Sequence, residues 1–536
     1  MRSRRSLLAL VLSMTSCLVL VAPASALTGS GSWGHLGTNG ETPQGSALNA
    51  HVYEMHRAGT ILYAGGAFTN AGGIPSADRI ASWDGDSWKS LSPTPIADNG
   101  SVFAIAHYGG KIYAGGNFMN AGGDPNADNL AVWDGVSWQP FCNSGIGPAF
   151  DGNVMALQVI GTTLYVGGTF QNAGGVAAAD YLVACDMNTG AMSAVVSTDG
   201  DFTGSVYDLT ASTDGILYAG GTFSNLDQIA AADFVASFDG TAWSSLGTTA
   251  IGGIVRGLHA IGTDVYVSSD GLDIGGESRS DHLVRWDGTT YNPVGSDTAG
   301  TNGYFPSSAT INELTTSGTL LFAAGQWLDA NGQPKADMVA YFDGTTWRAI
   351  GSNGAGNGAL NANTEGLAVV SGILYAGGAS TSAGGDPKAN FAASRSLKLA
   401  DAEIGNSSGN YVGNDVYSTT GAGQTKTVSI GRGTSKFFPV LIQNDGLLPA
   451  SFTLKGTGAA TGYTVTYIDY SNGENITSAI RNGTFNTGTL ARGQSFAMKV
   501  IVKLSSSAAE RGTFLVTAES TAGSPKDTVK GVVDAT

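Results

Sequence analysis

One unit of about fifty residues recurs seven times along this chain of 536 residues and constrains its fold more than any other feature. The clearest copies are residues 62–88, LYAGGAFTNAGGIPSADRIASWDGDSW, and 112–138, IYAGGNFMNAGGDPNADNLAVWDGVSW. In every copy an aromatic residue is followed fifteen positions later by an acid or its amide. These pairs are Tyr63/Asp78, Tyr113/Asp128, Tyr165/Asp180, Tyr218/Asp233, Tyr266/Asp281, Phe322/Asp337 and Tyr375/Asn390. A repeat of this length, rich in β-formers, glycine and aromatics, predicts the blades of a β-propeller.

Each repeat divides into four short apolar runs separated by glycine-rich breaks. In the second copy the runs lie at 102–106, 111–114, 129–133 and 137–141. Four short strands joined by tight turns predict one antiparallel blade. An Asp-Gly pair before the fourth run indicates a hairpin, because glycine tolerates a positive φ. This pair begins at Asp84, Asp134, Asp239, Asp287 and Asp343.

Three further positions of the repeat have predicted structural roles. An aromatic residue four positions after the Asp-Gly aspartate, such as Trp88, is expected to pack between neighbouring blades. Paired glycines after the second run, such as Gly65-Gly66, let backbones approach closely where blades crowd. The acid of each aromatic–acid pair precedes the third run, where a carboxylate can accept backbone N–H bonds of the loop. We therefore interpret these acids as structural.

The two ends of the repeat region predict how the ring closes. The seventh copy keeps LYAGG from Leu374, but no aromatic fourth run follows it. Residues 30–37 read SGSWGHLG and match the fourth-run pattern TAWSSLG around Trp243. A strand around Trp33 is therefore expected to complete the last blade, which removes open sheet edges. The predicted fold class is all-β, with a seven-bladed β-propeller over residues 27–398 closed by this N-terminal strand.

A second domain is predicted over residues 399–536, where the repeat stops and Thr, Ser, Gly and Val become frequent. Segments such as 494–505 alternate between apolar and polar residues. Seven or eight short alternating strands predict an Ig-like β-sandwich, here without framework cysteines. Asn472-Gly473 and Asn482-Gly483 are typical of turns between such strands.

The N-terminus has the pattern of a secretory signal peptide over residues 1–26. Arg2, Arg4 and Arg5 precede an apolar run, and Ala24-Ser25-Ala26 is a small-residue cleavage site. The run is short, so we expect it to be cleaved rather than inserted in a membrane. The protein is therefore predicted to be secreted, extracellular or at the cell surface. Its formal net charge of −16 disfavours nucleic acid as a partner, because phosphates would repel it.

Two cysteines, Cys142 and Cys185, remain after the predicted cleavage. They lie in adjacent repeats, so the sequence is compatible with a disulfide and equally with two buried thiols. An exported chain with so few cysteines relies on its core rather than on a disulfide framework.

Strand alternation predicts which loops share a face of the propeller. The loops between second and third strands lie at the same end as the connections between blades. These connections vary, at 92–100, 143–152, 296–308 and 351–363. Variable loops on a repeated scaffold are the usual place for binding specificity. This face and the mouth of the central channel are the predicted site.

The repeats resemble kelch-type propeller repeats, with a glycine pair after the second strand and a tryptophan in the fourth. The pattern LYAGGxFxNAGG…ADxxAxWDGxxW is also similar to repeats of large secreted or cell-surface bacterial propellers and of some fungal cortical proteins. The resemblance covers about residues 30–398. It implies the fold, but proteins of this architecture include both binding proteins and enzymes. The C-terminal part is similar to Ig-like modules appended to bacterial extracellular propellers.

Two enzyme families with propeller folds offer comparisons, and neither matches. Galactose-oxidase-like enzymes need copper held by two His and two Tyr, one Tyr being cross-linked to Cys. Here His51 and His56 are the one close pair of histidines and flank a predicted first strand, so we favour chance positions, while Cys185 takes a Trp position. Sialidases carry S-x-D-x-G-x-T-W boxes, whereas this repeat reads D-G-x-x-W, and arginines for a substrate carboxylate are sparse.

Acids outside the repeat pattern are the remaining candidates for chemistry. Glu54, Glu313 and Glu365 lie in or beside first strands, which line the channel, and paired carboxylates there could hydrolyse glycosides. Glu277 lies in a loop and is a weaker candidate. A Ca²⁺ ion in the acidic loop 124–128 is possible, although its spacing lacks a full ligand set. We expect no other cofactor.

Three functional hypotheses follow. The first is a secreted, non-enzymatic binding protein whose loop face recognises an extracellular glycan or protein. The second is an extracellular polysaccharide-active hydrolase or lyase that uses the channel carboxylates. The third is a structural component of an envelope or matrix. The sequence favours the first, because most acids occupy repeat positions where a structural role suffices.

Overall fold

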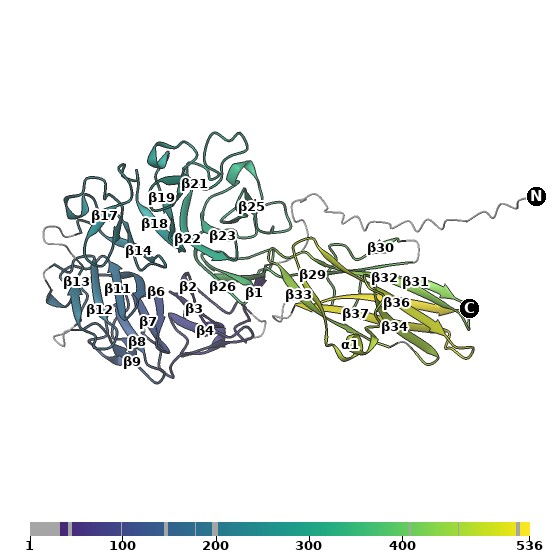
Figure 1. Ribbon diagram of the computed structural model, residues 1–536. Coiled ribbons are helices and arrows are strands. Elements are labelled where there is room, and N and C mark those ends of the chain that lie inside the picture. Colours follow the sequence, from purple (N-terminus) through teal and green to yellow (C-terminus); the bar gives the residue numbers. More distant parts are fainter. Residues whose placement is uncertain are drawn as a thin grey trace, which may run out of the picture.

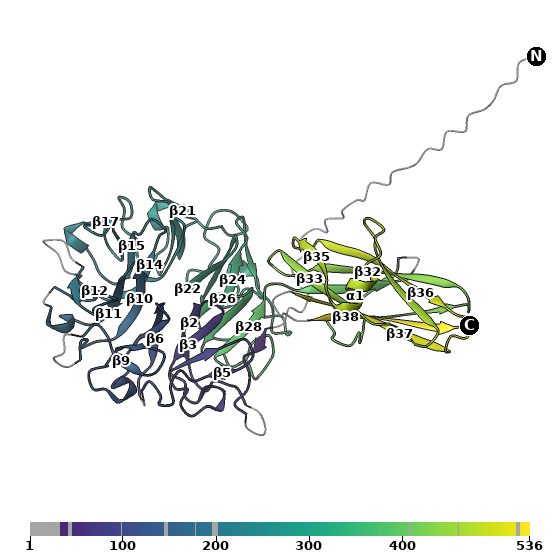
Figure 2. The same ribbon diagram turned by 60° about the horizontal axis from the view of Figure 1, so that its bottom comes forward.

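The structure is a computed structural model that describes residues 33–40, 45–97, 99–143, 148–176, 178–195, 202–406, 409–458, 460–520 and 526–536. A ring of blades is followed along the chain by an elongated two-sheet domain (Figures 1 and 2). The predicted signal peptide lies outside the described residues. In the described part, no helix is both long and apolar enough to cross a membrane.

The ring consists of seven four-stranded antiparallel sheets, here blades 1 to 7 in chain order from β2. The prediction of a seven-bladed propeller of kelch-like repeats is confirmed. The innermost strands are β2 (Val52–Ala58), β6 (Val102–Tyr108), β10 (Val154–Ile160), β14 (Val206–Ala211), β18 (Val255–Ile261), β22 (Thr310–Ser317) and β26 (Thr364–Val370). The second strands are β3 (Ile61–Gly66), β7 (Lys111–Gly116), β11 (Thr163–Gly168), β15 (Leu217–Gly221), β19 (Asp264–Ser269), β23 (Leu320–Gln326) and β27 (Ile373–Gly378).

The outer half of each blade is shorter. The third strands are β4 (Ile80–Trp83), β8 (Leu130–Trp133), β12 (Leu182–Asp186), β16 (Val235–Phe238), β20 (Leu283–Trp286), β24 (Val339–Phe342) and β28 (Ala392–Ser396). The fourth are β5 (Trp88–Lys89), β9 (Trp138–Pro140), β13 (Met192–Ala194), β17 (Trp243–Ser245), β21 (Tyr291–Pro293) and β25 (Trp347–Ala349). Between second and third strands lie 3-10 turns η1 (Ala71–Gly73), η2 (Ala121–Gly123), η3 (Ala173–Gly175), η4 (Leu226–Gln228), η5 (Ile274–Gly276) and η6 (Ala330–Gly332).

Blade 7 is completed by the N-terminal strand β1 (Gly34–His35), as predicted. Gly34 pairs with Ser394 of β28, so β1 takes the fourth-strand place. The indole N–H of Trp33 donates to the backbone oxygen of Ile350 in blade 6 at 2.8 Å. Trp243 and Trp347 make the same bond to the blade before theirs. Each of these indoles is buried between blades and joins them, which confirms the predicted packing role.

The repeated acids have the structural role predicted for them. In blade 1, Oδ1 of Asp78 accepts the backbone N–H of Asn70 at 2.6 Å, which holds the loop between second and third strands. The same bond forms in blades 2 to 6, from Asp128, Asp180, Asp233, Asp281 and Asp337. These six loops are therefore copies of one hydrogen-bonded turn.

Glycines of the repeat fill places where a side chain has no room. A Cβ added to Gly66 would lie 2.2 Å from the backbone oxygen of His51, and one added to Gly65 would lie 2.8 Å from Val102 of the next blade. Gly85 has a φ of 105° in the Asp-Gly hairpin, whose Asp84 accepts two backbone N–H bonds through Oδ1. The predicted hairpin and the predicted close approach of blades are both confirmed.

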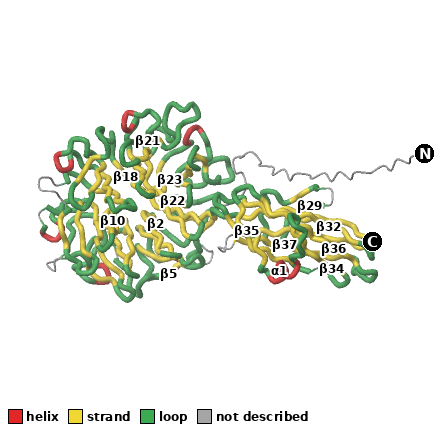
Figure 3. Tube along the Cα trace, viewed as in Figure 1, coloured by secondary structure: helices red, strands yellow, loops and turns green. Residues whose placement is uncertain are grey.

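The C-terminal domain is a sandwich of two five-stranded sheets, with a short helix (Figure 3). One sheet contains β29 (Ala400–Gly405), β30 (Tyr411–Val412), β32 (Ser435–Asn444), β34 (Tyr463–Asp469) and β36 (Ser495–Leu504). The other contains β31 (Thr425–Ile430), β33 (Ala450–Gly456), β35 (Phe485–Leu490), β37 (Arg511–Ser520) and β38 (Asp527–Ala535). The sequence predicted seven or eight strands, so the sandwich is larger than expected.

One predicted turn of the sandwich is a helix end instead. Asn482-Gly483 closes α1 (Thr477–Asn482), and Gly483 adopts a φ of 66° as the residue that terminates the helix. The dipeptide signal was wrong about the element because an αL glycine serves both hairpins and helix C-termini. Ile480 of this helix is buried in the sandwich core.

Contacts of three kinds join the two domains. The N–H of Leu448 donates to the backbone oxygen of Leu397 at 3.0 Å, and Leu447 packs into the hydrophobic cluster of blades 6 and 7. Arg492 of the sandwich donates from Nη1 to the hydroxyl of Tyr341 in blade 6 at 3.1 Å. The sandwich is therefore anchored to the propeller by apolar burial as well as by the chain itself.

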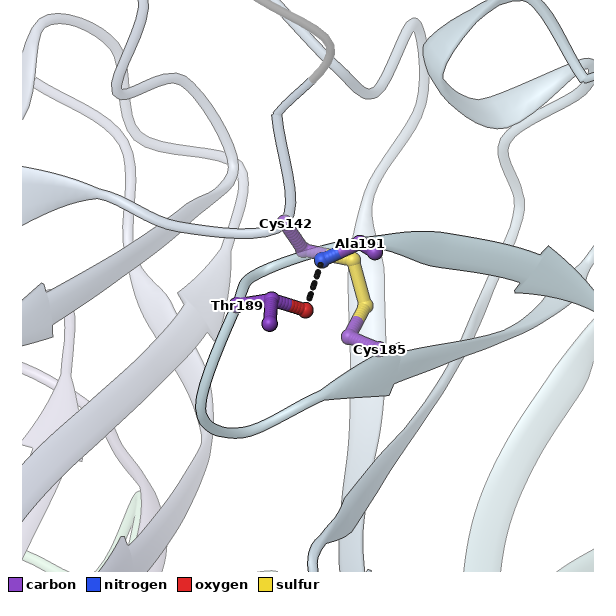
Figure 4. Close-up of a disulfide and its surroundings, with 4 residues drawn as sticks. All are labelled: Cys142, Cys185, Thr189 and Ala191. Atoms are coloured by element: carbon purple, nitrogen blue, oxygen red, sulfur yellow. Dashed lines mark hydrogen bonds between the residues drawn. A yellow bond between two sulfur atoms is a disulfide. The ribbon is translucent and has the colours of Figure 1, made fainter.

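Cys142 and Cys185 form a disulfide, with their Cα atoms 5.7 Å apart (Figure 4). Cys142 follows β9 and Cys185 lies in β12, so the bond links blades 2 and 3. In the turn beside it, Oγ1 of Thr189 accepts the N–H of Ala191 at 3.2 Å. Of the two alternatives compatible with the sequence, the structure has the disulfide, which is typical of oxidising compartments.

Candidate functional site

Seven β-bulges surround one mouth of the central channel. Near the start of each innermost strand the pairing skips one residue, as between Val52 and Glu54 of β2. A bulge leaves the skipped residue unpaired and re-aims its side chain. The seven skipped residues, here called the bulge ring, are Tyr53, Phe103, Met155, Tyr207, Arg256, Asn312 and Glu365, and all of them line one cavity of about 390 Å³.

The bulge ring lies on the face that the sequence predicted as the site. Each bulge is at the start of an innermost strand, where the connection from the preceding blade enters. Going round the ring, blades 1 to 4 supply an apolar arc of Tyr53, Phe103, Met155 and Tyr207. Blades 5 to 7 supply a polar arc of Arg256, Asn312 and Glu365. The mouth is thus apolar on one side and hydrogen-bonding on the other.

Rings stack along the apolar arc. Tyr53 lies between His51, whose ring is parallel to it at 4.6 Å, and Phe103, whose ring meets it edge-on at 5.0 Å. Burial, followed by the nearby charge of Glu365, raises the pKa of the Tyr53 hydroxyl, which therefore stays a neutral donor. The arc offers aromatic ring surface and a hydroxyl to a ligand.

The polar arc is held in place by a second layer of side chains. Arg256 donates from Nε and Nη2 to both carboxylate oxygens of Asp270, at 3.1 and 2.9 Å. Asn363 accepts from Asn312 at 2.8 Å and donates to Glu365 at 2.7 Å. Groups fixed in this way keep their orientation without a ligand, which lowers the entropy cost of binding.

Three carboxyl groups form the floor of the cavity. Glu54, Asp208 and Glu313, here called the acid tier, are each the residue directly after the bulge in blades 1, 4 and 6. The other four blades have Ala104, Ala156, Gly257 and Gly366 at this level. Small residues between the acids leave the tier open to the cavity above it.

The acid tier has few partners for its charge. Oδ2 of Asp208 accepts the N–H of Leu258 at 2.6 Å and Oδ1 accepts that of Leu209 at 2.7 Å. Burial and the charge of Asp208 raise the pKa of Glu54 to about 8, and burial raises that of Asp208 to about 7. Burial, then the charges of Glu54 and Asp208, raise the pKa of Glu313 well above its usual range. At neutral pH these groups therefore retain protons in part.

Histidines line the channel on the far side of the tier. Nε2 of His56 lies 2.8 Å from Nδ1 of His107, and its Nδ1 lies 4.0 Å from Glu54. Burial, then His107, lower the pKa of His56 to about 4, and burial lowers that of His259 to about 4. Both rings are therefore neutral at physiological pH and add no positive charge below the acids.

The sequence candidates meet at one place, with one exception. Glu54, Glu313 and Glu365 all line the same cavity. Glu277 does not; it pairs with Arg279 at 2.8 Å in an exposed loop. Asp208 was absent from the candidates, although aligning VYEM, VYDL and INEL of blades 1, 4 and 6 places it level with Glu54 and Glu313.

In the part of the chain that the structure describes, no group of three His, Cys, Asp or Glu side chains is arranged to hold a metal ion. His51 and His56 do not converge: His51 lies 3.1 Å from Glu365 and His56 contacts His107. In the loop considered for Ca²⁺, Asp124 accepts the N–H of Asn126 and so stabilises a turn.

These observations define a β-propeller of kelch-like repeats with a C-terminal β-sandwich and a ligand-sized channel mouth. Residues 80–270 match the family model described as the Rax2 C-terminal beta propeller domain. No curated protein matches the chain.

Several solved structures resemble segments of the chain. A family 123 glycoside hydrolase from Clostridium perfringens has 9% identity over 26% of this chain and 27% of its own, with a TM-score of 0.17. The CooA pilin subunit from enterotoxigenic Escherichia coli has 7% identity over 25% and 99%, with a TM-score of 0.16. The secreted serine protease VesC from Vibrio cholerae has 12% identity over 31% and 36%, also with 0.16. TM-scores of this size establish neither a shared overall fold nor a shared function.

Proposed function

We propose that this protein is a secreted, non-enzymatic binding protein that recognises an extracellular glycan at the bulge ring. The observation that carries the proposal is the division of the ring into an apolar and a polar arc. A sugar ring has an apolar face of C–H groups and an edge of hydroxyls. The rings of Tyr53, Phe103 and Tyr207 suit the first, and Arg256, Asn312 and Glu365 suit the second.

The size and shape of the cavity favour a glycan over a protein partner. A volume of about 390 Å³ lies within the range of small-ligand sites. A stable protein partner would cover roughly 800 Å² of each surface, so it would have to use the outer loops as well. The proposal therefore places one or a few sugar units in the mouth.

Secretion is supported by two independent features. The first 26 residues have the composition of a cleaved signal peptide. The disulfide between Cys142 and Cys185 fits an oxidising compartment outside the cytosol.

The acid tier supports a second candidate, a glycan-active hydrolase or lyase. Glycoside hydrolysis needs one protonated and one ionised carboxyl group at the scissile bond. Glu54 and Asp208 have pKa values raised to about 8 and about 7, so they could divide these states near neutral pH. The tier lies below the ring, and so an enzyme would have to bring the scissile bond down to it.

A glycan array probed with the chain from residue 27 onward tests the proposal, with product release assayed on each bound glycan. The double variant Y53A/Y207A should weaken binding at least tenfold, since stacking is worth about 1 kcal/mol or more per ring. Tyr470 is an exposed aromatic of the sandwich, so Y470A is the matched control and should bind normally.

Unchanged binding by Y53A/Y207A would overturn the assignment of the site. Product release that disappears in E54Q or E313Q would replace the binding function with the hydrolase or lyase. Thermal unfolding of each variant shows whether it is folded.

A further inference from the structure

We propose that the glycan bound at the bulge ring carries a free ammonium group, as in an amino sugar that is not N-acetylated, and that this group sits over the acid tier. The inference rests on the proposed function and names the class of ligand. It follows from what lies beneath the ring, whereas the glycan proposal follows from the ring itself.

The cavity has acids without cations to balance them. Glu54, Asp208 and Glu313 lie at one level, and Glu365 lies at the rim. Among the described residues that line the cavity, Arg256 is the single basic side chain, and Asp270 already holds it through both carboxylate oxygens. A positive group on the ligand would stabilise the ionised form of these carboxyls, because opposite charges attract strongly where water is excluded.

The apolar arc also suits a cation. Tyr53, Phe103 and Tyr207 present aromatic rings around the space above the tier, and aromatic faces attract ammonium groups within about 6 Å of the ring centre. This feature is independent of the acids, since the rings come from the bulges and the carboxyls from the next residue. A neutral sugar with a hydroxyl at this position could contact the aromatic rings, but it would bring no positive charge to the carboxyls of the acid tier.

The positive group is organic rather than a metal ion. In the described part of the chain, the acids and histidines form no group of three that could hold a metal. The small residues at the level of the tier leave room for a group larger than an ion. An ammonium on a sugar ring can donate to several carboxyl oxygens while its ring stacks on the arc.

Binding of a cation to this floor has a measurable consequence. Burial and the charge of Asp208 raise the pKa of Glu54 to about 8, and burial raises that of Asp208 to about 7, so without a ligand both are mostly protonated at pH 6. A bound ammonium stabilises the ionised carboxylates, so protons leave the protein as it binds. A neutral sugar would release none.

The experiment is isothermal titration calorimetry at pH 6 of the folded chain from residue 27 onward. The probes are a β-1,4-linked glucosamine tetrasaccharide and the same tetrasaccharide fully N-acetylated. We expect the free amine form to bind about tenfold more tightly, with a heat that depends on the ionisation enthalpy of the buffer. The variant E54Q/E313Q should bring the two affinities within about threefold, whereas E277Q, an acid of the exposed loop, should keep the preference.

Each outcome separates the two proposals. Equal affinity for both tetrasaccharides, or tighter binding of the N-acetylated one, would overturn the inference and leave the glycan function standing. A trilysine peptide that binds as tightly as the amine tetrasaccharide would overturn the glycan as the source of the ammonium. If the protein binds neither tetrasaccharide and no glycan of the array, both proposals are overturned. If a variant unfolds at the same temperature as the wild type, its loss of preference for the amine tetrasaccharide is not caused by a loss of structure.

Discussion

The acid tier of the propeller and a second group of buried acids in the sandwich have similar electrostatics and opposite surroundings. The sandwich acids are Asp401, Asp445 and Asp527. Burial, then the charges of neighbouring acids, raise the pKa of Asp401 to about 8, close to the value of Glu54 in the tier. Burial also raises the pKa of Asp445 and that of Asp527. A raised pKa therefore does not by itself distinguish the two groups.

Hydrogen bonds distinguish Asp445 and Asp527 of the sandwich from Glu54 of the tier, whereas Asp208 and Glu313 of the tier do accept backbone N–H groups. Both oxygens of Asp527 are used, by the backbone N–H groups of Ala402, Ser418 and Thr528 and by the amide of Gln424. Asp445 accepts from the hydroxyl of Tyr417 at 2.8 Å. Glu54 faces an open cavity, and Nδ1 of His56 lies 4.0 Å from its carboxylate. Acids that join strands together are structural, whereas acids that line an accessible cavity remain available to a ligand.

The largest expected effect on stability comes from substituting one of the sandwich acids, Asp527. D527A would remove the acceptor of three backbone N–H groups, those of Ala402, Ser418 and Thr528, and one of the two acceptors of the Gln424 amide. Each unsatisfied buried group costs roughly 1–3 kcal/mol. We expect the free energy of unfolding of the sandwich to fall by about 3 kcal/mol or more. All nine tryptophans lie in the propeller, so hydrogen exchange of β29 and β38 is the appropriate measurement.

The matched control lies on the same strand. Asp534 pairs with Arg511 at 2.8 Å on the surface, and D534A should cost less than about 1 kcal/mol. If D527A lowers the free energy of unfolding as little as D534A does, the hydrogen bonds of Asp527 are not what distinguishes the two groups of acids.

The second prediction concerns the pH dependence of the sandwich. Asp401 has a folded pKa of about 8, above the value of about 3.9 in an unfolded chain. Its unfolded form therefore loses the proton first as pH rises, and stability declines between about pH 4 and pH 8 by up to about 1.4 kcal/mol per pH unit. D401N removes this titration and should flatten the profile, measured by urea unfolding monitored by circular dichroism. A wild-type profile that rises over this range would contradict it.

The fold could be predicted because its signals are repeated and local. The seven pairs of an aromatic with an acid or its amide, the Asp-Gly hairpins and the glycine pairs each recur, and each has its own structural reason. Trp33 stood out as the one fourth-strand pattern without a third strand before it. The sandwich had no repeat, so its strands were undercounted. Asn482-Gly483 was misread because the same αL glycine can end a helix or close a turn.

The site could be predicted only in part. The position of Glu54 and Glu313 in first strands, which line the channel, predicts that they lie there, and the structure places both at the cavity. Variable loops predict the face on which this candidate site lies. The bulges were not predicted, because the one-residue shift that a bulge makes in the alternation is hard to see in a run of seven residues, so Tyr53 and Phe103 looked like ordinary strand residues. Asp208 could have been found by aligning the first strands of the blades, but the stronger signals of the repeat lie in other strands.

The third prediction tests the propeller side. E54Q/E313Q replaces two carboxyls that are costly to ionise with neutral amides of the same shape. Because their folded pKa values are raised, the wild type loses stability as pH rises through them, and the variant does not. Between pH 5 and pH 9 the stability of the variant should therefore rise relative to that of the wild type, by up to about 1.4 kcal/mol per pH unit for each carboxyl that stays protonated in the folded state. Thermal unfolding followed by tryptophan fluorescence measures the difference.

Asp208 provides a contrast within the acid tier. It accepts the N–H groups of Leu258 and Leu209, so it combines a ligand-facing position with a structural bond. At pH 9, D208N should therefore raise the free energy of unfolding less than E54Q/E313Q does. At pH 5 it should lower the free energy of unfolding by about 1 kcal/mol. Stabilisation of D208N at both pH values would mean that these bonds contribute nothing.

The smallest expected effect belongs to an acid in neither group. Glu277 lies in an exposed loop on the same face as the bulge ring and pairs with Arg279 at 2.8 Å. Exposed pairs of this kind contribute little, so E277Q should change the free energy of unfolding by less than about 0.5 kcal/mol and leave glycan binding unaltered. Loss of binding in E277Q with retained binding in Y53A/Y207A would place the ligand on the loop tips instead of in the channel mouth. The acid tier would then be a buried cluster like that of the sandwich, and the distinction drawn from the open cavity would fail.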